Sequence, residues 1–451
     1  MTFLPTKGNS FRGVLAHVCD FLPESPLQSG GIVVYYPYYK HTEIPMHNIE
    51  ALCPPDAAYI IEKLNSAGYS AYAVGGCVRD TLLGILPHDW DITTSALPEA
   101  VLEVFKDEHT IPTGLKHGTI TVMMHHEPYE ITTFRIDGAY SDSRHPESVT
   151  FSDRISDDLS RRDFTINALA WNKHSGVVDC FSGIEDLKAG VIRAVGDPKT
   201  RFEEDALRIL RGYRFAAQLG FKIEEETRNA LRSEAYRLKN ISRERISSEF
   251  CRLVAAKGAH SVLKMLESDG IFPYILDGAA YHLPDPSVFD RITEVPPTAE
   301  DRIAFLIRGY DPEAVTGWLR GLRLSNRQHK DILTLIDADS YASAPATPYD
   351  ARRMLAVCGE LSERVLTIAA LHGVTDTEEK RKMIRTAREN GDCVAIASLA
   401  VNGKNLIREG IAKGAQIGKV LSALLDAVLH DPAKNTPETL IEIARETAKT
   451  V

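Results

Sequence analysis

The stretch AVGGCVRDTLLGILPHDWDITTS, residues 73–95, constrains the fold of this chain more than any other. A short apolar run ends at Gly75 and Gly76, and the residues CVRDTLLG that follow predict a short helix. Asp89 and Asp91 then stand one residue apart on a predicted strand, whose period of two places both carboxylates on one face. A strand, a glycine turn, a helix and a second strand in so short a stretch predict a mixed α/β unit.

The two carboxylates suggest a metal. Like charges side by side are unfavourable unless a cation lies between them, and Mg²⁺ is held by one or two carboxylates together with substrate phosphates. Such a pair suits nucleotidyl transfer, in which one metal activates a hydroxyl and another holds the leaving phosphates. A D-x-D pair also occurs in glycosyltransferases and at solvated strand ends, so it leaves those alternatives open.

The glycine turn favours a nucleotide. Backbone without a Cβ can approach a phosphate closely, which makes Gly76 a candidate phosphate contact. Arg79 follows in the first predicted helical turn, where it could bind a triphosphate, and Asp80 would orient it. The structural alternative for Gly75 and Gly76 is a plain corner between a strand and a helix.

Arginines recur in two later segments. LSRRDFTINALAW places Arg161, Arg162 and Asp163 at a predicted helix start, where they suit ribose and phosphate contacts or form an ion-pair cluster with the sheet. EEDALRILRGYRF then has charged residues at steps of three, which share a helix face. They either line a cleft or form a solvated face, and the apolar residues between them favour the cleft. These residues are Asp205, Arg208, Arg211 and Arg214.

Composition excludes several classes of protein. The chain has 451 residues, 44% of them hydrophobic and 25% charged, as in ordinary globular proteins. Seven scattered cysteines without C-x-x-C spacing argue against a disulfide framework and a zinc site, and favour a cytoplasmic location. The sequence shows neither a transmembrane run nor a signal peptide, so no membrane partner is expected. A net charge of −10 gives no global support for nucleic-acid binding, although a local basic surface could still bind it.

Taken together, the motifs resemble a known family. G-G-x-V-R-D, D-x-D, R-R-D-F-T-x-N-A and E-D-x-x-R occur in this order, and over about residues 50–260 the chain resembles the class II nucleotidyltransferases. That branch comprises the tRNA CCA-adding enzymes and bacterial poly(A) polymerases. The resemblance implies an α+β fold, in which a nucleotidyltransferase-type mixed β-sheet head is followed by an all-α neck, body and tail.

The expected organisation follows the chain. Residues 1–45 show no sustained period and read as an extension, with Met46 as a possible natural start. Strand-rich and helical runs alternate up to about residue 195, and beyond residue 199 the strands are expected to stop. Two Pro-rich linkers, HLPDPSVFDRITEVPPTAED and SYASAPATPYD, interrupt the helices. The expected domains are a head at 46–195, a neck at 196–275, a body at 276–345 and a tRNA-binding tail at 346–451.

The resemblance also implies site roles. Asp89 and Asp91 would be the catalytic metal ligands, Gly76 and Arg79 triphosphate contacts, and Arg162 with its neighbours ribose and phosphate contacts. Asp205 and Arg208 would read the base. This last role has a physical account, because cytosine and adenine each present an exocyclic amine beside a bare ring nitrogen, which a carboxylate and an arginine can satisfy. Uracil and guanine reverse that order.

Three further segments carry weaker expectations. The polar segment 137–151 reads as a mobile loop over the site, a loop that CC-adding members of the family lack. In a predicted neck helix, Arg243, Glu244 and Arg245 are as consistent with a structural role as with a functional one. The basic helix 378–390 is a candidate tRNA contact, although a solvated helix face explains it better.

The sequence therefore predicts an Mg²⁺-dependent enzyme that adds CMP and AMP, from CTP and ATP, to the 3′ end of tRNA. Within the same chemistry, the alternatives are an A-adding tRNA enzyme and a poly(A) polymerase. From other classes, a catalytically silent RNA-binding protein and a metal-dependent glycosyltransferase remain. Intact aspartates argue against the first of these, and the arginine motifs argue against the second.

Overall fold

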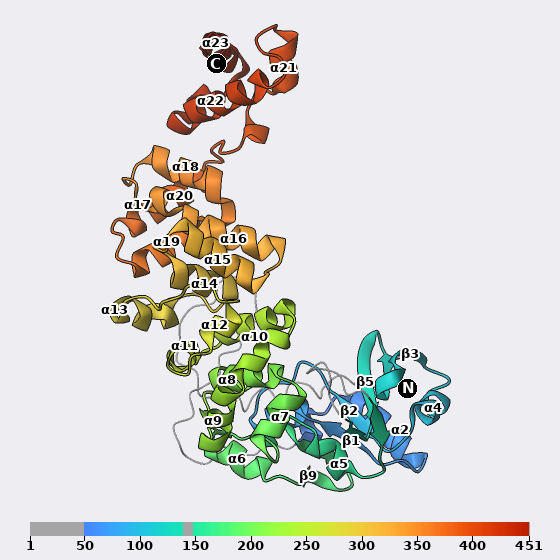
Figure 1. Cartoon of the computed structure of the whole chain (residues 1–451). Helices are drawn as coiled ribbons and strands as arrows, with labels where there is room; N and C mark the ends of the chain where they lie inside the picture. Colours follow the sequence, from blue (N-terminus) through green and yellow to red (C-terminus); the bar gives the residue numbers. More distant parts are fainter. Residues whose placement is uncertain (1–48, 139–147, 451) are drawn as a thin grey trace, which may run out of the picture. The chain divides into compact units, whose positions relative to one another are not determined.

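The computed structural model describes residues 49–138 and 148–450. The predicted extension 1–45 and the expected start at Met46 lie outside these residues, as do residues 139–147 of the predicted loop. In Figure 1 the part of the chain coloured from blue to green contains the main sheet, and the yellow, orange and red part consists of helices.

A seven-stranded sheet organises the first part of the described chain. Its strands span Ala71–Val74 (β1), Ile92–Thr94 (β2), His109–Gly114 (β3), Thr119–Met124 (β4), Glu127–Thr133 (β5), Leu169–Asn172 (β8) and Gly176–Asp179 (β9). They lie in the order β3, β4, β5, β2, β1, β8, β9. β2 and β5 are parallel and the other neighbouring pairs are antiparallel, so the sheet is mixed, as predicted.

Short helices flank this sheet. α2 packs against β1 and β2, and α4 packs against β4. The helices and 3₁₀ turns of this part are Ile49–Leu52 (α1), Pro55–Ser66 (α2), Gly76–Leu82 (α3), Pro98–Val104 (α4), Leu115–His117 (η1), Ile155–Ser160 (α5), Thr165–Asn167 (η2) and Gly183–Ala189 (α6).

The sequence explains both ends of α2. Pro54 is the N-cap and Pro55 the first helical residue, a position where the missing N–H of proline costs nothing. The apolar residues Ala57, Ile60, Ile61 and Leu64 recur at helical spacing and are buried. Beyond the last turn, Gly68 has a φ of 91°, a conformation that favours glycine and ends the helix.

Two small sheets accompany the large one. β6 (Arg135–Asp137) pairs antiparallel with β7 (Val149–Phe151). β10 (Val191–Ile192) pairs parallel with β11 (Lys222–Ile223), so the prediction that strands stop after residue 199 is wrong. A strand of two residues is too short for its alternation to stand out from the helical pattern around it.

The rest of the described chain is helical. Its helices are Pro198–Glu204 (α7), Leu207–Leu219 (α8), Glu225–Ser233 (α9), Arg243–Ala255 (α10), Ala259–Ser268 (α11), Phe272–Ile275 (α12), Pro286–Phe289 (α13), Ala299–Ile307 (α14), Pro312–Leu322 (α15), Asn326–Asp337 (α16), Asp339–Ser343 (α17), Pro348–Cys358 (α18), Ser362–Leu371 (α19), Thr377–Glu389 (α20), Gly403–Arg408 (α21), Gln416–His430 (α22) and Pro437–Thr447 (α23). The 3₁₀ turns are Ala235–Asn240 (η3), Asp290–Glu294 (η4), Gly359–Leu361 (η5), Ile396–Ser398 (η6) and Pro432–Lys434 (η7).

Both predicted linkers contain helix. α13 and η4 lie in the first linker, and Phe289, Ile292 and Val295 bury their side chains there. α17 and the start of α18 lie in the second. Proline at the first position of α13 and α18 begins a helix rather than breaking one, which is why the proline content was misleading.

Apolar packing in the described residues forms one large core, a small cluster around Val74 and Leu159, and a separate core near the C-terminus. The large core runs from Ile49 to Ala387, and the C-terminal core joins Cys393 to Ala444 through ten buried side chains. The predicted α+β fold, a mixed sheet followed by helices, is thus confirmed. None of the helices in the described residues combines the length and apolar character that a membrane span requires.

Candidate active site

Gly75 joins β1 to α3 in a backbone conformation that favours glycine. Its φ is 83° and its ψ −126°, a region that residues with a side chain rarely adopt. A Cβ at this position would also lie 2.7 Å from Nη1 of Arg162. The predicted strand, turn and helix are confirmed, and Gly76 is the first residue of α3. The guanidinium group of Arg162 thus lies close to this turn.

Asp89 and Asp91 lie just before β2, which corrects the prediction that both belong to a strand. The Val74 N–H donates to the Asp91 carbonyl at 3.0 Å, but β1 ends at Val74 and leaves no partner for earlier residues. Trp90 is only 7% exposed, whereas both aspartates are exposed. This alternation places the two carboxylates on one side, as the D-x-D spacing predicted.

Glu130 is a third carboxylate, which the sequence analysis missed. β2 and β5 are parallel with Ile92 opposite Ile131, so the preceding residues Asp91 and Glu130 are neighbours in register. Although Asp91 is exposed, the protein atoms around its carboxyl group reduce its hydration, and together with the charge of Asp89 they raise its pKa to about 6; Arg162 opposes the shift and Glu130 adds to it. The alternating residues of YEITTFRI are typical of a strand, but they do not indicate which strand lies beside it in the sheet.

The aspartate pair fits a hard divalent cation. Among the described residues no group of three or more His, Cys, Asp or Glu side chains is placed to hold a metal ion. Mg²⁺ needs only one or two carboxylates and completes its shell with water and substrate phosphates. Desolvation is the larger cause of the raised pKa of Asp91, and the neighbouring charge of Asp89 is the next; a bound cation would relieve the repulsion between the two carboxylates.

Arg79 is buried and held from two sides. Its Nε donates to Asp80 at 2.8 Å, and its Nη1 donates to the side-chain oxygen of Asn167. The predicted orienting role of Asp80 therefore has a matching contact. Burial raises the pKa of Asp80, to which Asp89 contributes, so this carboxyl group feels the charge of the D-x-D pair.

Asn167 links Arg79 to helix α8. Its amide donates to Oδ1 of Asp163 at 2.9 Å, and Oδ2 of Asp163 accepts from Nε of Arg211 at 2.7 Å. Asn167 is 5% exposed and Asp163 7% exposed. Burial opposes ionisation of Asp163, yet Arg211 and Asn167 hold its pKa well below the ordinary value. A continuous series of polar contacts thus runs from α3 to α8, and the sequence analysis gave Asn167 no role in it.

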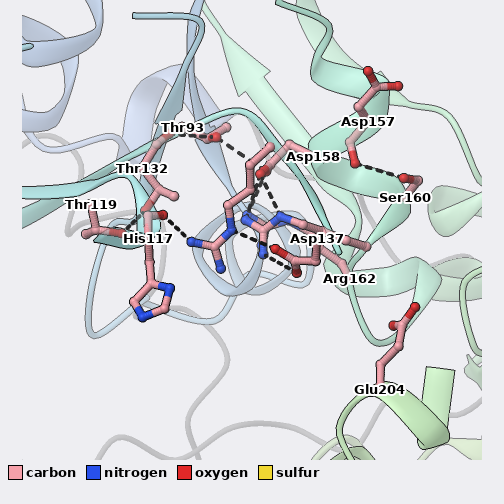
Figure 2. A network of polar contacts seen from close by, with 12 residues as sticks. Thr93, His117, Thr119, Thr132, Asp137, Asp157, Asp158, Ser160, Arg162 and Glu204 are labelled. Atoms are coloured by element: carbon pink, nitrogen blue, oxygen red, sulfur yellow. Dashed lines mark hydrogen bonds and ion pairs between the residues drawn. The ribbon is translucent and has the colours of Figure 1, made fainter. Parts of the chain in front are cut away.

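Arg161 and Arg162 follow the end of α5, so the predicted helix start at this point is wrong. Arg161 is the C-cap of α5, and only a 3₁₀ turn follows. Both arginines pair with the fully buried Asp158, Arg161 at 2.7 Å and Arg162 at 3.3 Å. Thr93 of β2 donates to the same carboxylate at 3.3 Å (Figure 2). The ion-pair alternative is therefore present in the structure.

Asp158 stays ionised because of this pairing. Burial opposes its charge, but Arg161 and Arg162 outweigh burial and hold its pKa below the ordinary value. Sequence reasoning missed Asp158, which the structure places between the arginines and the sheet. Asp158 precedes Arg161 by three residues and Arg162 by four, which is the spacing of ion pairs in a helix. This spacing was the signal in the sequence that could have identified Asp158.

The predicted loop begins and ends in a described hairpin. Residues 135–137 and 149–151 form β6 and β7, and residues 139–147 lie outside the described part. Arg135 donates to Asp137 at 2.9 Å and to the carbonyl of His117 (Figure 2). Asp137 also lies 3.7 Å from Nη1 of Arg161. The base of the loop is thus in contact with the arginine pair.

Asp205 interrupts the helix that the sequence predicted around it. α7 ends at Glu204 and α8 begins at Leu207. Oδ1 of Asp205 accepts the Leu207 N–H at 3.0 Å, which satisfies the first backbone donor of α8; the N-cap itself is Ala206. Only Arg208, Arg211 and Arg214 therefore share the α8 helix. Acidic residues and alanine are all compatible with a continuous helix, so the pattern concealed the break.

The predicted charges meet in a pocket of about 270 Å³. Its lining joins the arginine pair after α5 to the start of α8, so a cleft is present where one was expected. The lining residues are Arg161, Arg162, Asp163, Asp205, Leu207, Arg208, Arg211 and Arg245. Arg214 is not among them.

Arg208 and Asp205 already have partners within the protein. Arg208 donates to Glu204 at 2.7 Å and to the carbonyl of Arg161 at 2.8 Å. Asp205 accepts from Nη2 of Arg245 at 3.1 Å, while Nη1 of Arg245 is buried without a partner. Arg245, which the sequence left between a structural and a functional role, thus lines the pocket and contacts Asp205.

Arg214 has a structural environment. It donates to Glu249 of α10 at 2.5 Å, and its guanidinium lies 3.9 Å from the ring centroid of Phe215. The same ring has Arg79 at 4.9 Å and Arg211 at 5.2 Å. Stacking on one buried ring therefore holds three arginines from α3 and α8.

Family models match three successive segments of the chain. They are the poly(A) polymerase head domain over residues 71–193, an RNA- and SrmB-binding site of polymerase A over 220–283, and tRNA nucleotidyltransferase domain 2 over 297–444. The first segment contains every strand of the seven-stranded sheet.

Relatives named CCA-adding enzyme match nearly the whole chain. The protein from Leuconostoc mesenteroides is 36% identical over 90% of this chain and 98% of its own length. That from Lactobacillus helveticus is 37% identical over 84% of this chain and 94% of its own length. This chain belongs to the CCA-adding enzymes.

A solved CCA-adding enzyme has the same fold. The Bacillus stearothermophilus enzyme in complex with CTP superposes with a TM-score of 0.74 at 31% identity, covering 88% of this chain and all of that one. A Thermotoga maritima CCA-adding enzyme, solved with tRNA, superposes with a TM-score of 0.61 at 22% identity, which supports the fold alone.

Proposed function

We propose that this CCA-adding enzyme transfers CMP and AMP, from CTP and ATP, to the 3′ end of tRNA. The observation that carries this proposal is the position of Arg162. It lines the charged pocket and lies against the Gly75 turn, and its positive charge acts on Asp91, where it opposes the rise in pKa. A nucleotide with its base in the pocket would therefore have its phosphates within reach of the carboxylates.

Base selection is assigned to Asp205 and Arg208. A carboxylate acceptor and a guanidinium donor satisfy the amine and the ring nitrogen of cytosine and of adenine. Uracil or guanine would leave Asp205 facing a carbonyl, and an unsatisfied buried group costs about 1–3 kcal/mol. On this proposal the incoming base replaces the contacts with Glu204 and Arg245.

The phosphates are assigned to the arginines around the glycine turn. Arg79, Arg161 and Arg162 supply guanidinium groups, and Gly76 supplies backbone without a Cβ. Arg211 and Asp163, on the pocket wall, are assigned to the ribose. Arg214, which packs on Phe215 and pairs with Glu249, is assigned a supporting role for α8.

Asp89 and Asp91 would hold Mg²⁺. When bound, the metal activates the attacking hydroxyl and stabilises the leaving phosphates. Asp89→Ala and Asp91→Ala should each reduce incorporation by several orders of magnitude while thermal melting changes little, because both side chains are exposed. Glu99→Ala, an exposed carboxylate on α4, is the matched control. Near-full activity of either aspartate variant with Mg²⁺ present would overturn the assignment, and a folded, inactive natural chain would favour a silent RNA-binding protein.

The test of the function measures product length on three tRNA forms, ending at the discriminator base, at C and at CC. We expect two cytidines with CTP alone, one adenosine once ATP is added, and no further growth. Addition to the CC form alone would show an A-adding enzyme. Long adenylate tails on unrelated RNA would show a poly(A) polymerase.

Arg208→Ala extends this test to base selection. Arg208→Ala removes the hydrogen-bond donor to the ring nitrogen, so it should slow incorporation of CMP from CTP. It should also reduce the preference for CTP over UTP by roughly tenfold, the equivalent of about 1.4 kcal/mol. Arg232→Ala, an exposed arginine on α9, is the control. Unchanged discrimination in Arg208→Ala would assign base selection elsewhere.

The proposed location is the cytoplasm. Cys53, Cys77, Cys180, Cys251, Cys358 and Cys393 are free thiols in the described part of the chain. Free thiols of this number are typical of a reducing compartment. In the cytoplasm, tRNA that lacks its 3′ end would be available as a substrate.

A further inference from the structure

Asp158 of α5 is a fully buried carboxylate to which the proposed function gives no role. A buried charge is tolerated where it is paired and hydrogen-bonded, and this one is bonded to the sheet as well as to two arginines of the site. Its partners are Thr93 of β2, Arg161 and Arg162. Because Thr93 belongs to the strand after the aspartate pair and both arginines line the charged pocket, Asp158 joins the two parts of the site.

The two oxygens of this carboxylate have different partners. Oδ1 accepts from Nε and Nη2 of Arg161, at 3.0 and 2.7 Å. Oδ2 accepts from Nη2 of Arg162 and from Oγ1 of Thr93, each at 3.3 Å. Figure 2 shows Asp158 between Thr93 and Arg162. Each arginine therefore depends on its own oxygen, and replacement of either oxygen would release one of them.

The hydrogen bond from the sheet relates Asp158 to the aspartate pair. Asp89, Asp91 and Thr93 follow one another at intervals of two residues in extended chain, so their side chains share one face. Two residues of extended chain span about 6–7 Å. The bond from Thr93 therefore holds Asp158, and the arginines paired with it, close to the two carboxylates that would bind the metal.

Arg162 depends on Asp158 for its orientation. Within the described residues, the bond to Oδ2 of Asp158 is the only hydrogen bond of its side chain, and its Nε is buried without a partner. The same guanidinium lines the charged pocket and lies against the Gly75 turn. A guanidinium binds phosphate through a planar set of donors, so its orientation determines whether it can form paired bonds. Arg162 thus has donors left for a ligand but a single contact to direct them.

We propose that Asp158 is a positioning residue for nucleotide binding, which holds Arg161 and Arg162 against β2 so that both meet the triphosphate of the incoming nucleotide. This inference rests on the proposed function, which assigns the phosphates to these arginines. Asp158 itself does not touch the nucleotide. It acts on the phosphates, which CTP and ATP share, and leaves selection of the base to other residues.

The test uses Asp158→Asn in the full chain. Asparagine keeps the shape of the side chain but replaces one oxygen with an amide donor, which must then face an arginine or the hydroxyl group of Thr93. Equilibrium binding of CTP and of inorganic pyrophosphate is measured without tRNA, so that no nucleotide is consumed. KM values for CTP, ATP and UTP are measured with tRNA, and thermal melting checks the fold.

We expect Asp158→Asn to bind CTP and pyrophosphate at least about tenfold more weakly, as the loss of a charge-assisted phosphate contact predicts. The KM values for CTP and ATP should rise by the same factor, because both nucleotides carry the same triphosphate. The preference for CTP over UTP should change by less than about twofold. A merely structural role would lower the melting temperature and the amount of active enzyme without this pattern of KM values.

Two controls match Asp158 in position and in burial. Asp157→Asn changes the preceding residue of α5, whose carboxylate pairs with Arg154 at 3.2 Å rather than with the arginines of the site. Asp301→Asn changes a carboxylate of α14 that is 1% exposed and pairs with Arg364 at 2.7 Å, so it breaks a comparable buried ion pair elsewhere. Both controls should bind CTP within about twofold of the natural chain, although Asp301→Asn should melt at a lower temperature.

A milder variant covers the case in which Asp158→Asn does not fold. Thr93→Val removes the hydroxyl group that joins Asp158 to β2, and it should weaken CTP binding at least about threefold. Thr94→Val is its control. Thr94 is equally buried, and its Oγ1 accepts the Ala96 N–H at 3.1 Å, away from the arginines.

Two results would overturn the proposal. One is natural affinity for CTP and pyrophosphate in folded Asp158→Asn, or in Thr93→Val where the first variant does not fold. The other is an equal loss of affinity in Asp158→Asn and Asp301→Asn, which would reduce the effect to general destabilisation. Failure of the proposed function is seen separately, because the natural chain would then not extend tRNA. A natural chain that extends tRNA, together with a variant that binds CTP normally, rejects the positioning role alone.

Discussion

At the scale of single residues, a few buried polar side chains determine where the arginines of the site point. Asn167 is the clearest of them, because its two side-chain atoms serve Arg79 on one side and Asp163 on the other. Neither neighbour can turn away without leaving a buried group unsatisfied, which costs about 1–3 kcal/mol. On the proposed assignments, Asn167 would therefore position Arg79 at the triphosphate and Asp163 beside the base pocket.

Asn167→Ala should raise the KM for CTP about tenfold and change kcat less, because Arg79 and Asp163 lose a shared partner. Asn172→Ala is the matched control: Asn172 is equally buried, at 5% exposure, and donates to the carbonyl of Ala71 away from the arginines. Both variants should melt at lower temperature, but only the first should change KM. A similar KM for both would show that Asn167 is merely structural.

The sequence predicted which residues lie together better than it predicted the residues that they contact. The face shared by Asp89 and Asp91 follows from backbone alternation alone, and the arginine motifs did meet in a pocket. Glu130 is a neighbour of Asp91 only because β2 and β5 pair in parallel. Asn167 accepts a hydrogen bond from Arg79, although the two residues are far apart in the sequence. Such contacts depend on the order of the strands, which local patterns do not encode.

At the scale of elements, α20 shows how a charge pattern can mislead. Helical spacing predicted the helix correctly, yet the same spacing could not show that Lys380 points inward. Its Nζ donates at 2.9 Å to the carbonyls of Tyr341 and Ala342 and at 2.5 Å to that of Ala344. Lys380 thus caps the end of α17, and burial lowers its pKa.

Lys380→Met should lower the free energy of unfolding by about 2–4 kcal/mol, because it keeps the length of the side chain but leaves three carbonyls without a donor. Lys382→Met, on the exposed face of the same helix, should change stability by less than about 0.5 kcal/mol. Urea unfolding of both variants makes the comparison. Equal stability of the two would contradict the capping role.

His372, at the end of α19, should make the free energy of unfolding depend on pH. It caps the C-terminus of the helix, and Nε2 hydrogen-bonds to the Phe305 carbonyl at 3.1 Å. Burial lowers its pKa to about 4; Arg308 and Arg291 lower it further, while the Phe305 carbonyl and Asp339 oppose them. Between this value and the ordinary pKa of about 6.5, the unfolded chain binds a proton that the folded chain does not.

Stability should therefore rise with pH from about 4 to 6.5, by at most roughly 3 kcal/mol from this group. His372→Gln cannot titrate, so the difference in unfolding free energy between pH 7 and pH 5 should be smaller than in the natural chain. His329→Gln, an exposed histidine on α16, is the control. The same pH dependence in His372→Gln and the natural chain would exclude this histidine as the source.

At the scale of the whole molecule, the C-terminal core is separate from the large one. The large core ends at Ala387, and the C-terminal core begins at Cys393. Polar contacts connect them: Arg352 of α18 donates to the Leu429 carbonyl at 2.6 Å, and Tyr349 donates to Asp426 at 2.7 Å. The expected boundary between body and tail at residue 345 stays a prediction. The boundary between the two apolar cores lies near residue 390.

The separate core predicts two unfolding events. A core of ten buried side chains stabilises its region less than the large core does, so residues 391–450 should unfold at lower urea concentration. Trp90, Trp171 and Trp318 all belong to the large core, so tryptophan fluorescence reports that core alone, whereas far-ultraviolet circular dichroism reports all helices. Part of the helical signal should be lost before the fluorescence changes, and a chain ending at residue 390 should keep the fluorescence midpoint while losing that early phase. Coincident transitions in the full chain would show instead that the contacts of Arg352 and Tyr349 join both cores into one cooperative unit.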